Sequence, residues 1–299
     1  STENTFPTGQ ATKRIDFVVT LKTPPTTVVK SNVIYNLDGV NVAITSDHYP
    51  LYCDFKKPTG LEEYPKAEGD LRIGNYFLTY CKGTDGVIDY DRTGRIIAKM
   101  NADIVCLQGL DKETERSEGI DQLNVLAQKA NMYDYFAKAI DYKGGEFGVG
   151  ILTKEEPVSV DRYQMAGKSE MRAAMVVEYE KFVVASTNFD TDMAKRIEAL
   201  QTLETKLSAY NKPAFLLGYF NEGDLESEFF QMVKSNWNLL SADKSTEVSG
   251  KKRRLDFIVS LKSHNVNVTQ ADVIESLSGV DVTVASTHYP LFCDFSGLK

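Results

Sequence analysis

The chain has 299 residues, of which 42% are hydrophobic and 25% are charged, and it contains four cysteines. Its net charge of −8 argues against a nucleic-acid-binding protein, because such proteins gain affinity from basic contacts to phosphates. Four cysteines in a chain of this size do not make a disulfide framework, and no apolar run reaches the length of a membrane span. The composition is that of a globular protein with room for one large or two ordinary domains.

The first part of the chain shows little pattern that could form a core. Residues 1–12 are polar and contain Pro and Gly, which predicts a loop. Apolar runs at 17–21 and 40–44 predict two strands, with a pair of prolines between them. Residues 56–69 hold two prolines, two glycines and many charges, so we interpret this stretch as a linker and place a domain boundary there.

From residue 70 onward, apolar runs that predict strands alternate with amphipathic patterns that predict helices. The clearest helix covers 193–207, where apolar residues recur with a period of 3.6. An antiparallel strand pair is expected at 176–179 and 182–186. The other expected strands are 73–80, 104–107, 148–153 and 215–217, and the other expected helices cover 91–100, 120–130 and 229–233. Mixed strand pairs with helices outside predict two packed sheets flanked by helices.

Residues 13–55 and 253–295 are two copies of one segment. They align without a gap, and roughly half of the positions are identical, far more than unrelated segments would share. The matched pairs include Asp16 with Asp256, His48 with His288, and Cys53 with Cys293. We interpret both cysteines as buried free thiols on equivalent strands. The chain therefore holds the tail of one module, followed by a longer region that ends in the same tail.

The repeated segment resembles the closing motifs of the endonuclease/exonuclease/phosphatase superfamily, which read Arg-Leu-Asp-Phe and Ser-Asp-His-x-Pro. Further motifs of that family occur in order within 70–299. They are TYC at 79–81 (usually TYN), LQGLD at 107–111 (usually LQEVD), TNF at 187–189 (usually THL) and GYFN at 218–221 (usually GDFN). The resemblance covers essentially all of 70–299. It implies the α/β (α+β) four-layer sandwich of DNase I, in which two mixed β-sheets are flanked by helices.

The resemblance also implies phosphoester hydrolysis beside Mg²⁺ or Mn²⁺, which needs hard oxygen ligands and a base that activates water. Most matched positions carry the wrong residue for this chemistry. Gly109 replaces the metal-binding Glu and has no side chain, and Cys81 offers a soft ligand where the family has Asn. Asn188 replaces a His and does not titrate near neutral pH. Tyr219 replaces an Asp with a bulky neutral group.

The last substitution is Thr287, which replaces the Asp before His288, so we expect this histidine to have lost its orienting carboxylate. Asn221, Asp256 and His288 keep the family residue, and Arg172 is a further candidate. With the other groups gone, we interpret the retained residues as vestigial and structural. We expect the larger region to bind no metal or other cofactor.

The short copy keeps the complete tail motif, with Asp16, Asp47 and His48. It lacks the strands that would carry the rest of that module's site. The expected partner of residues 1–55 is therefore an upstream module of the same protein or another copy of the chain.

Two functions remain open from the sequence. The first is a non-catalytic pseudo-hydrolase domain that binds a ligand or supports a neighbouring module. The second is a metal-dependent phosphodiesterase or phosphatase with an unusual site. A phosphate-containing ligand is compatible with both, whereas nucleic acid and a membrane span are not expected. We expect a periplasmic or secreted location rather than a cytoplasmic one.

Overall fold

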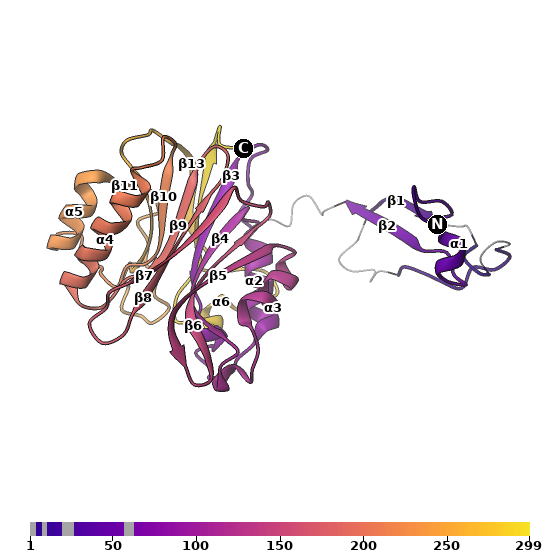
Figure 1. Ribbon diagram of the computed structural model, residues 1–299, viewed down its shortest axis with the longest axis horizontal. Coiled ribbons are helices and arrows are strands. Elements are labelled where there is room, and N and C mark those ends of the chain that lie inside the picture. Colours follow the sequence, from indigo (N-terminus) through magenta and orange to yellow (C-terminus); the bar gives the residue numbers. More distant parts are fainter. Residues whose placement is uncertain (1–3, 8–10, 20–26, 57–62) are drawn as a thin grey trace. The chain divides into compact units, whose positions relative to one another are not determined.

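The computed structural model describes residues 4–7, 11–19, 27–56 and 63–299. These form two compact units, a smaller one within 1–63 and a larger one, 64–299 (Figure 1). Each unit is described by itself. Among the described residues, no helix is both long and apolar enough to cross a membrane.

The larger unit contains two six-stranded sheets, each of which mixes parallel and antiparallel neighbours. The first sheet has the spatial order β13 (Asn267–Val273), β14 (Leu291–Ser296), β3 (Leu71–Phe77), β4 (Ile104–Lys112), β6 (Gly145–Thr153) and β5 (Tyr133–Tyr142). The second has the order β11 (Trp237–Leu239), β12 (Asp256–Leu261), β10 (Ala214–Tyr219), β9 (Val183–Asn188), β8 (Arg172–Glu178) and β7 (Ser159–Met165).

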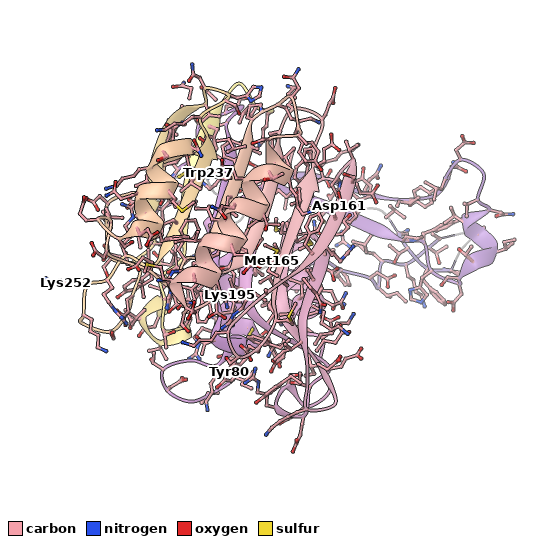
Figure 2. All side chains as sticks on the ribbon, turned by 60° about the vertical axis from the view of Figure 1, so that its left-hand side comes forward. Tyr80, Asp161, Met165, Lys195, Trp237 and Lys252 are labelled. Carbon is pink, nitrogen blue, oxygen red and sulfur yellow. The ribbon has the colours of Figure 1, made fainter. Side chains whose placement is uncertain are left out.

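Helices cover the outer face of each sheet (Figure 1). They are α2 (Tyr90–Met100), α3 (Gln122–Ala130) and α6 (Val282–Ala285) on the first sheet, and α4 (Met193–Leu207) and α5 (Glu228–Asn236) on the second, with short 3₁₀ turns η1 (Thr79–Cys81) and η2 (Glu115–Ser117). One apolar cluster fills the space between the sheets, and one lies under each helical layer. Trp237 is buried at the end of α5 and donates its indole N–H to Glu204 of α4 (Figure 2). The predicted four-layer α/β sandwich is thereby confirmed.

Local sequence signals explain where the helices begin. Asp89, Asp121 and Asp192 each accept a backbone N–H from the first turn of α2, α3 and α4, and Ser227 does the same for α5. The predicted helix 193–207 matches α4, and the antiparallel pair predicted around 176–186 is β8 with β9. Strands β5, β7, β11 and β13 were not predicted.

The smaller unit contains β1 (Thr27–Val33), the short helix α1 (Val42–Thr45) and β2 (Leu51–Lys56). Both strands predicted here are wrong in the described residues. Phe17–Val19 lie in no strand, and the stretch 40–44 forms a single bridge at Val40 followed by α1; residues 20–21 lie outside the described part. In the larger unit the segment that matches residues 17–21 is β12, which pairs with β10 on one side and with β11 on the other. Without such neighbours the apolar run has no ladder to join.

The two copies share their strand register. In the smaller unit Thr27 pairs with Lys56, and in the larger unit Asn267 pairs with Ser296. Both ladders contain a bulge at the same point, between residues 28 and 30 and between 268 and 270. The similarity of sequence therefore extends to backbone pairing.

Part of the stretch that we interpreted as a linker packs on the larger unit. The ring of Tyr64 lies 5.7 Å from that of Phe292, and its carbonyl accepts a hydrogen bond from Arg72. Lys66 forms an ion pair with Asp103 at 2.7 Å. The segment before β3 is thus part of the larger unit from Tyr64 onward.

Candidate functional site

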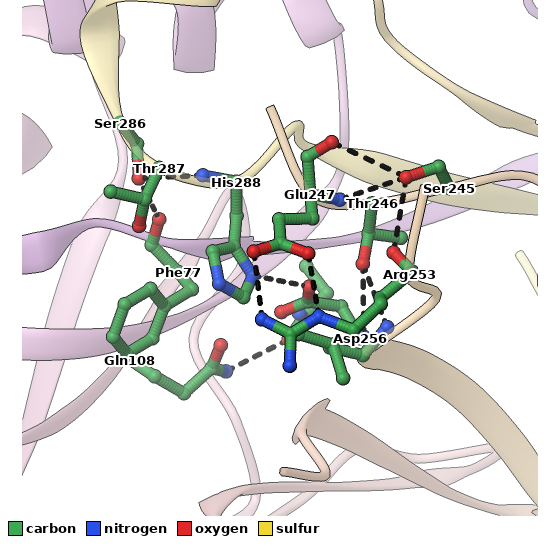
Figure 3. A network of polar contacts seen from close by, with 12 residues as sticks. Phe77, Gln108, Ser245, Thr246, Glu247, Arg253, Asp256, Ser286, Thr287 and His288 are labelled. Atoms are coloured by element: carbon green, nitrogen blue, oxygen red, sulfur yellow. Dashed lines mark hydrogen bonds and ion pairs between the residues drawn. The ribbon is translucent and has the colours of Figure 1, made fainter. Parts of the chain in front are cut away.

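Figure 3 shows a histidine and a carboxylate in contact. Nδ1 of His288, in the loop after α6, lies 2.6 Å from Oδ2 of Asp256, the first residue of β12. Both side chains are buried. Ser286 Oγ accepts the backbone N–H of His288, and Thr246 Oγ1 accepts the backbone N–H of Asp256, at 3.2 Å each. We call Asp256 and His288 the C-terminal dyad.

This geometry corrects one expectation. We expected His288 to lack an orienting carboxylate because Thr287 stands where the family has Asp. The orienting group is instead Asp256, which lies on another element and 32 residues away. A carboxylate bound to one ring nitrogen fixes the imidazole's orientation and tautomer. Thr287 contacts Thr79, with 3.0 Å between the hydroxyl oxygens.

The smaller unit repeats the dyad. Nδ1 of His48 lies 2.8 Å from Oδ2 of Asp16, and Thr5 Oγ1 accepts the backbone N–H of Asp16 at 3.4 Å. The hydrogen bond from Thr5, and then that from His48, lower the pKa of Asp16. Asp47 lies farther away, with Oδ1 at 4.0 Å from His48 Nε2. The dyad side chains are each 35% exposed here.

In the larger unit, the rings of Phe77 and Tyr219 lie next to the imidazole of His288, which belongs to the C-terminal dyad. The ring centroids of Phe77, Tyr219 and His288 lie 4.7–4.8 Å from one another. We call these three residues the aromatic cluster. Gly109 lies against it, because a Cβ at this position would be 3.2 Å from Cε2 of Phe77. At the position that the resemblance assigns to a metal-binding Glu, a side chain would therefore crowd the phenyl ring of Phe77.

Phe77 is the site residue that sequence reasoning missed. Cys81, which we aligned with the family's Asn, lies in η1 and is buried in the apolar layer beneath α2. Burial raises the pKa of its thiol. Strand β3 ends at Phe77, so Phe77 is the residue that this strand delivers to the site. The predicted strand covers 73–80, and a prediction that ended this strand at Phe77 would have placed Phe77 at the site.

Tyr219 ends β10 between two other motif positions. In the sheet it pairs with Asn188 on β9 and with Asp256 on β12. Burial, and then the charge of Asp256, raise the pKa of the Tyr219 phenol, so this group stays neutral. The strands therefore bring Asn188, Tyr219 and Asp256 side by side, as the resemblance implies, but with one carboxylate among them.

Asn221 and Arg172 are engaged in contacts within the chain. Asn221 has a positive φ of 56°, and its Nδ2 donates to the carbonyl of Phe189 at 2.7 Å. Arg172 binds the carboxylates of Asp190 and Glu170 at 3.1 and 2.9 Å. Both side chains are thus already bound to other groups of the chain.

A charged pair lies next to the dyad. Nε and Nη2 of Arg253 donate to the two carboxylate oxygens of Glu247 at 2.7 and 2.8 Å (Figure 3). These hydrogen bonds lower the pKa of Glu247 to about 2. Lys252, on the same loop, is exposed at the surface (Figure 2).

The residues of the site do not fit Mg²⁺ or Mn²⁺. Such ions take several oxygen ligands, mainly carboxylates and water. Asp256 is the one motif carboxylate here and already binds His288, while rings occupy the space next to it. Among the described residues, no group of three His, Cys, Asp or Glu side chains is placed to hold a metal ion.

Several solved structures are similar to this chain in overall fold. An endonuclease/exonuclease/phosphatase from Beutenbergia cavernae is 18% identical, with a TM-score of 0.65 over 77% of this chain and 73% of that one. A mannosyl-6-phosphatase from Bacteroides thetaiotaomicron is 15% identical, with a TM-score of 0.59 over 75% of this chain and 99% of that one. The catalytic domain of human Nocturnin, with bound sulfate, is 18% identical, with a TM-score of 0.57 over 76% and 93%.

No protein-family model matches the chain, and no curated protein matches it. At these identities the structural likeness establishes the fold. The chain has the DNase I-like fold of the endonuclease/exonuclease/phosphatase proteins, as the sequence motifs predict.

Proposed function

We propose that the larger unit is a pseudo-hydrolase, a non-catalytic domain with the endonuclease/exonuclease/phosphatase fold that binds or supports another component. The observation that carries this proposal is the aromatic cluster. Phe77 and Tyr219 fill the space beside His288, and Gly109 offers no ligand there.

The retained groups are too few for the chemistry of the fold family. Hydrolysis of a phosphoester needs a positioned nucleophile, a base and cationic or hydrogen-bonding groups that stabilise the phosphoryl oxygens. The C-terminal dyad offers one base. Arg172 is held by two carboxylates, and Arg253 is held by Glu247. In the part of the chain that the structure describes, these two guanidinium groups are therefore already paired with carboxylates.

A second candidate is a metal-dependent phosphoesterase, which the dyad itself favours. A buried His–Asp pair held by two hydroxyl groups is an arrangement that activates water in hydrolases. The structural neighbours include a phosphatase. In this candidate the aromatic cluster would have to open when substrate binds.

Hydrolysis of bis-p-nitrophenyl phosphate, DNA and RNA, each with Mg²⁺ or Mn²⁺, tests the two candidates. We expect no turnover above a buffer blank, and no heat of binding when either metal is titrated by calorimetry. Metal-dependent turnover that is lost in His288→Ala and kept in His264→Ala would establish the second candidate. His264 is the matched control because it is a histidine outside the site.

A further inference from the structure

Apolar side chains of the smaller unit are exposed where those of its C-terminal copy are buried. Phe17 is 61% exposed and Val19 is 85% exposed, whereas Phe257 and Val259 are fully buried under α4 and α5. The same contrast separates Ile15, Val18 and Leu37 from Leu255, Ile258 and Leu277. A cluster of exposed apolar groups of this kind marks an interaction surface.

The sheet edge shows the same difference. In the larger unit β14 pairs with β13 on one side and with β3 on the other. Among the described residues, the equivalent strand β2 pairs with β1 alone. An edge with open backbone groups is a template for pairing with another strand.

One aspartate in the closing strand has a different environment in the two copies. Asp294 on β14 binds the fully buried Arg72 on β3 through two hydrogen bonds, at 2.6 and 2.7 Å. Asp54 holds the matching position on β2, where its side chain is exposed. A carboxylate that is to be buried needs a cation. Asp54 faces Lys30 across the ladder of β1 and β2, but a strand that paired with the other edge of β2 and buried Asp54 would be matched by a basic residue at the position of Arg72.

We propose that residues 4–56, the N-terminal closing segment, complete a separate sandwich of this same fold that lacks its own closing segment. They would take the places that β12, β13 and β14 take in the larger unit, and Asp54 would bind the partner's buried cation. The larger unit is not this partner in the full chain, because its own residues 245–296, the C-terminal closing segment, fill those places. The proposal does not depend on whether the larger unit is catalytic.

The larger unit can serve as the test partner once its own closing segment is removed. In a chain that ends at Ala242, residues 4–56 are the closing segment that remains. Phe295 pairs with Leu71 in the full chain, so a closing segment that ends at Lys56 would lie next to the start of β3. Because the chain packs on the larger unit from Tyr64 onward, the seven residues 57–63 make the connection, and they reach roughly 23 Å at about 3.3 Å for each extended residue.

We expect chain 1–242 to be a monomer by light scattering and to unfold in one cooperative thermal transition, followed by near-ultraviolet circular dichroism. Chain 64–242, which has no closing segment, should show no such transition. Absence of the transition in 1–242 would overturn the proposal.

Two substitutions show whether the contacts are those proposed. Asp54→Asn and Phe17→Ala should each abolish the transition of chain 1–242 or lower its midpoint by at least several degrees. In the full chain both residues are exposed, so the same changes should leave its midpoint unchanged. Equal effects in the two chains would contradict the proposal. A full chain that dimerises while 64–299 stays monomeric would also overturn it, because a second copy would then be the occupant.

Discussion

A Cβ atom on Gly109 would lie 3.2 Å from the ring of Phe77. A side chain at Gly109 would therefore be in tight contact with this ring, and the ring would have to shift by a few tenths of an ångström to admit it.

The first prediction concerns the stability of Gly109→Ala. Gly109 has a φ of +73°, where any side chain is strained by about 1–2 kcal/mol, and the contact with Phe77 adds to this cost. Gly119 is the matched control, with a φ of +74° and no atom within 4 Å of its Cβ position. Urea unfolding should show a larger loss of unfolding free energy for Gly109→Ala than for Gly119→Ala.

A double-mutant cycle checks the origin of that difference. Phe77→Leu should reduce the cost of Gly109→Ala, with a coupling energy of about 0.5–3 kcal/mol, as for residues in contact. Additive effects of the two changes would show that the ring of Phe77 does not limit Gly109.

The second prediction concerns recovery of a metal site. Tyr219→Asp alone should stay inactive, because the groups of such a site act together and their effects are not additive. The first variant expected to bind Mg²⁺ combines Phe77→Asn, Gly109→Glu, Asn188→His, Tyr219→Asp and Thr287→Asp. Calorimetric titration with Mg²⁺ measures this. The same set with Cys81→Asn in place of Phe77→Asn is the control and should not bind. Turnover by Tyr219→Asp alone would disprove the prediction.

The motifs predicted the fold because their order along the chain is a property of the sequence alone. They did not predict Phe77, because the motif Thr79-Tyr80-Cys81 places Cys81 at the site, whereas strand β3 already ends at Phe77. Positive φ values at Thr79, Tyr80 and Cys81 turn the chain after the strand, and no sequence pattern signalled that turn. Backbone conformation, rather than residue type, decided which side chain reaches the site.

The two similar copies show a second limit. The run Asp256–Leu261 forms β12, whereas Phe17–Val19, its counterpart, lie in no strand. Strand formation depends on hydrogen bonds to neighbours that come from elsewhere in the chain. The orienting role of Asp256 was missed for the same reason, because the sequence does not show which distant carboxylate reaches His288.

The third prediction concerns the buried ion pair between Arg72 and Asp294. Arg72 is fully buried, and its guanidinium stacks 3.9 Å from the ring centroid of Phe292. Asp294→Asn leaves this cation without its charge partner, which should lower the unfolding free energy by about 3–5 kcal/mol. Urea unfolding of the full chain measures the loss.

Asp54 provides the matched control for that measurement. It occupies the equivalent strand position in the smaller unit but is exposed, so Asp54→Asn in the full chain should change the unfolding free energy by less than about 0.5 kcal/mol. Losses of similar size at the two positions would contradict the assignment of Arg72 to Asp294.

The last prediction is a pH dependence at Glu247. Arg253 lowers the folded-state pKa of Glu247 from 4.5 to about 2. A group whose pKa is lowered by folding stabilises the protein above its unfolded pKa, and this stabilisation disappears as the pH falls from 4.5 toward 2. Because Arg253 is half exposed, solvent screening limits the contribution to about 1 kcal/mol. Glu247→Gln should therefore destabilise the protein at pH 7, and the difference in unfolding free energy between this variant and the wild type should shrink below pH 4.5.

Urea unfolding across this pH range measures the difference. Glu226→Gln, in an exposed pair with Lys234, is the control. A difference that stays constant with pH would show that the ion pair with Arg253 is not its source.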